Sequence, residues 1–134
     1  MKQEKEAAGA GRISQVAGVE IEVAETAGFC FGGARAVDMV EHLLADGERV
    51  ATLGPLIHNP QVTGRLAAAG AVVADTPADI SAGAVAVVRS HGVGQAVFDQ
   101  LNDQGLRVAD ATCPFVAKIH AIARRCGEAG GTLL

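Results

Sequence analysis

Four residues that could do chemistry stand where short apolar runs give way to loops. They are Cys30, His58, His91 and Cys113. A thiolate is a ligand for iron or zinc, and an imidazole can donate a charge-assisted hydrogen bond to phosphate or carry a proton. The four residues are far apart in the sequence, so they form one site only if the fold brings the ends of several elements together.

The segment around Cys113 indicates how such a site could arise. An apolar run at 106–109 predicts a strand, and residues 116–129 predict a helix. Cys113 therefore lies between the carboxyl end of a strand and the N-terminus of a helix, where the partial positive charge favours thiolate over thiol. Pro114 suits the first helical position, because the backbone donor that proline lacks is not needed there.

Strands and helices alternate along the rest of the chain. Strands are expected at 19–25, 49–53, 71–73 and 84–89, another strand opens at 132–134, and helices end near Ala45, Gly70 and Asn102. This alternation predicts an α/β fold with a mostly parallel sheet and flanking helices. Such sheets bind ligands outside the carboxyl ends of their strands. Because Cys30, His58, His91 and Cys113 each follow a predicted strand, we expect them on one edge of the sheet.

The composition argues against several classes of function. A formal net charge of −4 and an aromatic content of 3% are not those of a nucleic-acid-binding protein. No apolar stretch approaches the length that crosses a bilayer. Three cysteines cannot all pair with one another, and the first residues lack the apolar core of a secretory signal, which favours a cytoplasmic protein. Residues 1–18 are polar, charged and rich in alanine and glycine, and we expect them to form a flexible tail.

Each candidate residue also has a purely structural interpretation. Cys30 and Cys113 could be small buried hydrophobic residues, although their positions in turns favour ligands. His58 could cap the helix that follows it, and the local sequence does not decide between a cap and a ligand. His91 ends a buried strand, a poor place for an imidazole without a partner, so function is favoured there. The loop at 28–33 could cradle a phosphate, but it does not match the dinucleotide-binding fingerprint.

Three further residues that could bear chemistry lie inside predicted helices. His42, His120 and Cys126 are interpreted as structural or surface residues. Cys126 follows Cys113 on one helix at a distance of about 20 Å along the axis, at about 1.5 Å per residue, which is too far for both thiols to hold one small cluster. The chain has no CxxC pair, so neither a zinc ribbon nor a thioredoxin-like dithiol is supported.

Four motifs in register resemble one known family. They are Gly28-Phe29-Cys30-Phe31-Gly32-Gly33-Ala34-Arg35-Ala36, Ile57-His58-Asn59-Pro60, Arg89-Ser90-His91-Gly92-Val93 and Asp110-Ala111-Thr112-Cys113-Pro114. Together, from about Val19 onward, they resemble the N-terminal part of the 4-hydroxy-3-methylbut-2-enyl diphosphate reductases, the LytB family. Gly33 stands where this family usually has valine, a departure that we expect to cost little.

The resemblance implies a redox enzyme with an iron–sulfur cluster. The family makes isopentenyl and dimethylallyl diphosphate in the last step of the non-mevalonate isoprenoid pathway. Cys30 and Cys113 match two of the three cysteines that hold its [4Fe-4S] cluster, which leaves one iron open to the substrate oxygen. His58 and His91 match residues that bind the substrate diphosphate. An electron donor such as ferredoxin or flavodoxin is also implied.

The resemblance also implies that the chain is a fragment. Family members fold as three similar α/β domains and are roughly twice as long; here 1–18 would be the tail, 19–112 the first domain and 113–134 the truncated start of the second. The third cysteine ligand and the proton-relay glutamate lie beyond Leu134 in the family, so no catalytic residue is expected here and the chain alone should be inactive. Two alternatives stay open: a non-enzymatic phosphate-binding α/β module, and an inactive truncation product.

Overall fold

The chain folds around a parallel sheet of four strands. The computed structural model describes residues 13–134. The sheet has the order β4-β3-β5-β6, and the strands are β3 (Val50–Leu53), β4 (Val72–Ala74), β5 (Val85–Val88) and β6 (Arg107–Asp110). Neighbouring strands all pair in parallel. The carboxyl ends of the strands therefore meet at one edge of the sheet, as the sequence predicts.

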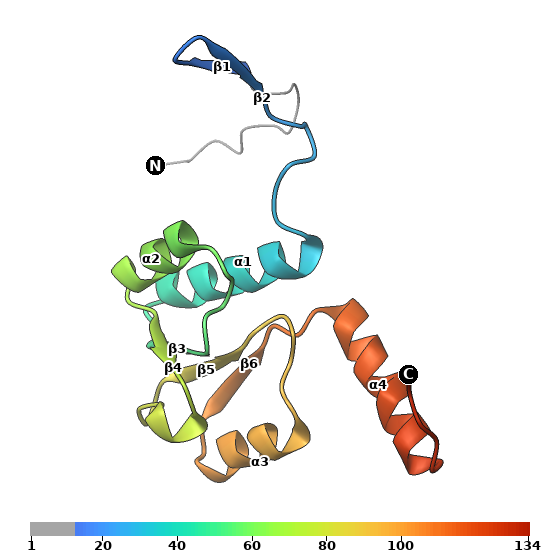
Figure 1. Ribbon diagram of the computed structural model, residues 1–134. Helices are drawn as coiled ribbons and strands as arrows, with labels where there is room; N and C mark the ends of the chain where they lie inside the picture. The colour runs from blue at the N-terminus through green and yellow to red at the C-terminus, as the bar shows by residue number, and fades with distance from the viewer. Residues whose placement is uncertain (1–12) are drawn as a thin grey trace.

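Helices cover both faces of this sheet (Figure 1). Helices α1 (Phe31–Ala45) and α2 (Pro60–Ala68) lie on one face, and α3 (Gln95–Asp103) lies on the other. Successive strand residues point to opposite faces. The core is accordingly in two parts: Val50 and Val87 pack with α1 and α2, while Ala51 and Val88 pack with Leu101 of α3.

The first predicted strand forms, but it does not join the parallel sheet. β2 (Val19–Glu22) pairs antiparallel with β1 (Ile13–Val16) in a separate two-stranded sheet. Ala17 and Gly18 connect them with φ values of 50° and 79°, the left-handed pair that a two-residue hairpin turn requires. Within the segment 1–18 that is expected to be a flexible tail, residues 13–16 form β1, and residues 1–12 lie outside the described part. The flexible tail stays a prediction.

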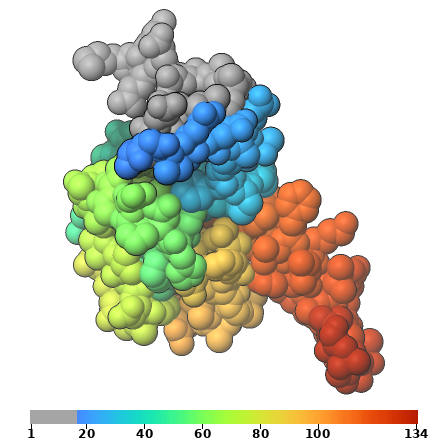
Figure 2. Space-filling model, turned by 45° about the horizontal axis from the view of Figure 1, so that its top comes forward, coloured from blue at the N-terminus to red at the C-terminus, as the bar shows by residue number. Residues whose placement is uncertain are grey.

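The last helix extends away from the body of the molecule. α4 (Pro114–Glu128) projects as an arm in Figures 1 and 2 and has no buried residue within the described chain. Its apolar side chains Phe115, Ile119 and Ile122 are exposed. Residues 132–134, predicted to open another strand, have no strand in the described structure. The division of the chain into domains at 112/113 stays a prediction.

No helix among the described residues is long and apolar enough to cross a membrane.

Candidate functional site at the carboxyl edge of the sheet

Both cysteines of the predicted site are N-cap residues of helices. Cys113 precedes Pro114, the first residue of α4, as the sequence predicts. Cys30 precedes Phe31, the first residue of α1. Cys113 is 9% exposed, whereas Cys30 is open to solvent. Each thiol therefore lies beside a helix end whose first backbone N–H groups are free, a setting that suits a negatively charged ligand sphere.

The first turn of α1 lies next to both thiols. A Cβ atom added to Gly32 would lie 2.8 Å from Cβ and 2.9 Å from Sγ of Cys113. A Cβ atom added to Gly33 would lie 3.8 Å from Sγ of Cys30. The two glycines thus let the helix backbone approach both thiols, and Cys113 occupies space that any side chain at residue 32 would fill.

Cys30 reaches this place by a different route from the one expected. Its preceding strand, β2, ends at Glu22 and pairs only with β1, so a loop leads to Cys30. The residue is positioned by α1 instead, because Val37 and Val40 anchor that helix in the core. Arg35 adds a further link, since its Nη1 donates a hydrogen bond of 3.2 Å to the carbonyl oxygen of Thr112 beside Cys113.

The two histidines face each other at the neighbouring strand ends. His58 lies in the loop after β3 and His91 in the turn after β5, and these two strands are adjacent in the sheet. Their imidazole rings are stacked, with centroids 6.4 Å apart and an interplanar angle of 26°. Both side chains are exposed. Two imidazoles so close together and open to solvent can donate hydrogen bonds to one small anion.

The structural alternative for His58 does not hold. Asn59 is the N-cap of α2, and its Oδ1 accepts hydrogen bonds of 3.1 Å from the backbone nitrogens of Gln61 and Val62. On the other side of His58, the side chain of Leu56 is buried in the core. His58 is thus held between two anchored neighbours while its own ring points outward without a capping role.

The turn that carries His91 is attached to the cysteine loop. Gly92, with φ of +72°, donates its N–H to the carbonyl oxygen of Arg89 at 2.9 Å and closes the turn. The backbone N–H of Cys113 then donates to the carbonyl oxygen of Ser90 at 3.0 Å. A backbone hydrogen bond therefore joins the turn that carries His91 to the loop that carries Cys113.

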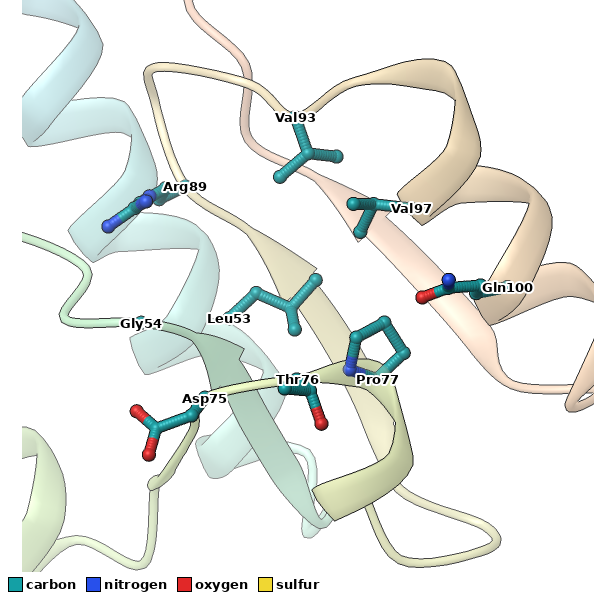
Figure 3. A pocket seen from close by; sticks show the side chains of 9 residues that line it. All are labelled: Leu53, Gly54, Asp75, Thr76, Pro77, Arg89, Val93, Val97 and Gln100. Atoms are coloured by element: carbon teal, nitrogen blue, oxygen red, sulfur yellow. The ribbon is translucent and has the colours of Figure 1, made fainter.

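Arg89 lies at the same carboxyl edge of the sheet as the two histidines, at the end of β5. It lines a cavity of about 360 Å³ between the ends of β3, β4 and β5 and helix α3 (Figure 3). Its guanidinium lies against Gly54, where an added Cβ atom would be 2.8 Å from Nη1. The Nε atom of Arg89 is buried and has no hydrogen-bond partner among residues 13–134. Nothing in the sequence singled out this arginine beyond its place in the third motif.

Cys126 and His42, two further residues that could bear chemistry, do not add a ligand beside Cys30 and Cys113. α4 is continuous from Pro114 to Glu128, so Cys126 lies about 20 Å along the axis from Cys113, at about 1.5 Å per residue. No group of three or more His, Cys, Asp or Glu side chains in the described chain is arranged to hold a metal ion. His42 is exposed on α1, where Nδ1 lies 2.6 Å from the carbonyl oxygen of Asp38.

Aromatic side chains link the two helix N-termini. The rings of Phe31, the first residue of α1, and Phe115, near the start of α4, meet edge to face with centroids 6.3 Å apart.

An ion pair lies beyond the far end of α1, away from the two thiols. Glu48 pairs with Arg107 at 2.6 Å, and the hydrogen bond and charge of Glu48 hold the pKa of Arg107 above its ordinary value.

Comparison with known proteins gives the same family for most of the chain. The family model described as LytB protein matches residues 21–134. The 4-hydroxy-3-methylbut-2-enyl diphosphate reductase of Dehalococcoides mccartyi is 45% identical over 112 residues, which cover 84% of this chain and 39% of that protein. The enzyme of the same name from Aquifex aeolicus is 44% identical over 103 residues, or 76% of this chain and 35% of that protein.

Solved structures agree in fold. The E-1-hydroxy-2-methyl-but-2-enyl-4-diphosphate reductase of Plasmodium falciparum superposes with a TM-score of 0.73 at 27% identity, over 77% of this chain and 33% of that one. A solved (E)-4-hydroxy-3-methyl-but-2-enyl diphosphate reductase superposes with a TM-score of 0.68 at 39% identity, over 78% and 37%. The chain spans about 39% of the length of the first curated relative that it matches. With a family model matched over residues 21–134 and the same α/β fold, the chain belongs to the LytB protein family.

Proposed function

We propose that this chain provides part of the active site of a 4-hydroxy-3-methylbut-2-enyl diphosphate reductase. In this proposal Cys30 and Cys113 are two of the thiolate ligands of a [4Fe-4S] cluster, and His58 and His91 bind the diphosphate of the substrate. The observation that carries the proposal is the stacked histidine pair beside two N-cap cysteines that flank one helix turn.

The donor set fits a cluster in part. Two thiols beside two helix N-termini suit an anionic cluster, because the free N–H groups there are potential donors to sulfide or thiolate. The space left by the missing side chain of Gly32 is filled by the Cys113 side chain, which orients this thiol toward α1. A bound cluster would supply electrons and a Lewis-acidic iron to remove the allylic hydroxyl of the substrate. Completion of the ligand set needs a third thiolate, which Cys126 is too distant to give.

The histidines would act on the other end of the substrate. The two exposed imidazoles offer donors on adjacent strand ends, and charge-assisted hydrogen bonds to phosphate are stronger than neutral ones. Their task in the proposal is to bind and orient the diphosphate, so that the hydroxyl-bearing end lies near Cys113. A small electron-donor protein, ferredoxin or flavodoxin, belongs to the same proposal.

The direct test uses a chimera. Residues 21–134 of this chain replace the matching part of the Dehalococcoides mccartyi enzyme, and anaerobic turnover is measured with a chemical reductant. We expect turnover in the chimera, loss of cluster absorption in its Cys30→Ser and Cys113→Ser variants, and no change in its Cys126→Ser variant, which is the matched control. A turnover-competent chimera that keeps its cluster in both ligand variants would contradict the proposed thiols.

A second measurement tests the chain as it is. Isothermal titration of residues 1–134 with inorganic pyrophosphate should show binding that His58→Ala and His91→Ala both weaken. If the chain binds pyrophosphate but the chimeras are inactive and hold no cluster, the results would instead support a non-enzymatic phosphate-binding module. Failure of both experiments would support an inactive product.

A further inference from the structure

His120 lies on α4, and its imidazole packs against the turn that carries His91. A Cβ atom added to Gly92 would lie 2.8 Å from Cε1 and 3.3 Å from Nδ1 of His120. The ring of His120, an exposed residue, therefore occupies the space that a side chain at residue 92 would take. From the sequence alone, His120 lies inside a predicted helix and is interpreted as a structural or surface residue, and nothing in the sequence indicates this contact.

The atoms nearest to an added Cβ atom at Gly92 belong to two side chains, His120 and Thr112. Gly92 itself adopts φ of +72°, a conformation that residues with side chains rarely take. Its N–H closes the turn onto Arg89, and the Cγ2 methyl of Thr112 is its other neighbour, at 3.2 Å from an added Cβ atom. The His120 ring and the Thr112 methyl thus lie on the side of Gly92 toward which a Cβ atom would point.

His91 depends on this turn for its orientation. Its side chain is exposed, and its described ring partner is the equally exposed His58. The direction of its Cα–Cβ bond is set by the backbone at 89–92. A ring that restrains Gly92 therefore restrains His91 as well.

We infer that His120 is a positioning residue for His91. The inference rests on the proposed role of His91 in binding a diphosphate. His120 does not touch the anion; it holds the Gly92 backbone, so that the His91 imidazole is already directed at His58 before a ligand arrives. Cys113 is the N-cap of α4 and His120 lies about two turns along the same helix, so α4 connects the thiol to the turn that carries His91.

The test compares three variants of residues 1–134: His120→Ala, His120→Phe and, as a matched control on the same helix, Lys118→Ala. The Phe variant keeps a planar ring and removes both ring nitrogens. The first readout is amide solvent exchange by nuclear magnetic resonance at Gly92 and Cys113, whose N–H groups make the turn hydrogen bonds. It is independent of any ligand.

We expect His120→Ala to raise exchange at Gly92 by about tenfold, with the β5 amides unchanged, because only local opening becomes easier. His120→Phe should restore exchange to within about twofold of the original chain, and Lys118→Ala should change nothing. Unchanged exchange at Gly92 in His120→Ala would overturn the inference. An equal rise at the β5 amides would also overturn it, since the histidine would then support the whole fold.

The second readout is the affinity for inorganic pyrophosphate. His120→Ala should weaken it by about threefold to tenfold, and His120→Phe should recover it, because pre-organisation and not a new contact is lost. Failure of His120→Phe to recover binding while it restores exchange would mean that an imidazole nitrogen contacts the anion, which overturns the positioning role. If the original chain binds no pyrophosphate while the exchange pattern holds, the proposed diphosphate-binding role of the histidines fails and the restraint on Gly92 stands.

Discussion

Substitution of Gly32 by alanine tests the contact between α1 and Cys113. The added Cβ atom would lie 2.8 Å from Cβ and 2.9 Å from Sγ of Cys113, whereas unstrained carbon contacts lie at about 3.5–4.0 Å. One of the two backbones must therefore move by about 1 Å, and overpacking of this kind costs about 1–3 kcal/mol. Alanine also gains about 0.5–1 kcal/mol over glycine in a helix, so the expected net loss of stability is about 0–2.5 kcal/mol.

The adjacent residue provides the control. At Gly33 the added Cβ atom would meet Cδ1 of Ile57 at 3.4 Å, the movable end of a side chain. The helix-propensity gain is the same for both substitutions because the two residues are neighbours in α1. The difference between Gly32→Ala and Gly33→Ala therefore isolates the steric cost, and we expect Gly32→Ala to be less stable by about 1–3 kcal/mol.

Urea denaturation followed by circular dichroism measures this difference. With a denaturant dependence of about 1–3 kcal/mol per molar urea, a gap of about 2 kcal/mol corresponds to a midpoint shift of about 1 M. In a Cys30→Ser, Cys126→Ser background, Gly32→Ala should also speed the reaction of Cys113 with a thiol reagent. Equal midpoints for the two alanine variants would refute the close approach of α1 to Cys113.

Three further predictions concern the supports of the site. Asn59→Ala should lower the free energy of unfolding by about 1 kcal/mol in urea denaturation, because the cap of α2 is lost. Substitution of the exposed His58 by alanine should change it by less than about 0.5 kcal/mol. A larger loss for His58→Ala would show that the histidine is the cap. Arg89→Met should change stability by less than about 1 kcal/mol by the same assay, since the buried Nε has no described hydrogen-bond partner, and a loss above about 3 kcal/mol would reveal a buried ion pair. A double-mutant cycle of Phe31→Leu and Phe115→Leu should give a coupling of about 0.5–1 kcal/mol, whereas strict additivity would contradict the edge-to-face contact.

The sequence was sufficient for the parallel sheet and for three of the four site residues. β5 is a continuous apolar run, and β3, β5 and β6 each end directly before a loop with a histidine or cysteine. The spacing of apolar residues and the turn residues within a short segment are enough to predict such strands. The shared edge then follows from parallel pairing alone, so it needs no knowledge of tertiary contacts.

The route to Cys30 could not be predicted from local pattern. An alternating segment such as 19–22 satisfies the pattern of a strand in any sheet, and the pairing partner is decided by the neighbouring turn. The hairpin at Ala17 and Gly18 takes β2 away from the parallel sheet, which leaves α1 to position Cys30. The contact between His120 and Gly92 was likewise invisible, because it joins two elements through a backbone without a side chain.

The order of the strands gives the site a direction and a length. His58 follows β3, His91 follows β5 and Cys113 follows β6, and these strands are consecutive neighbours in the sheet. Adjacent strands lie about 4.8 Å apart, so the distance across the sheet from β3 to β6 is about 10 Å. The imidazoles follow β3 and β5, so they lie one to two strand spacings, or about 5–10 Å, from the end of β6 that leads to Cys113. In the proposed function, a ligand held at the imidazoles by its anionic end would therefore extend across the strand ends toward Cys113.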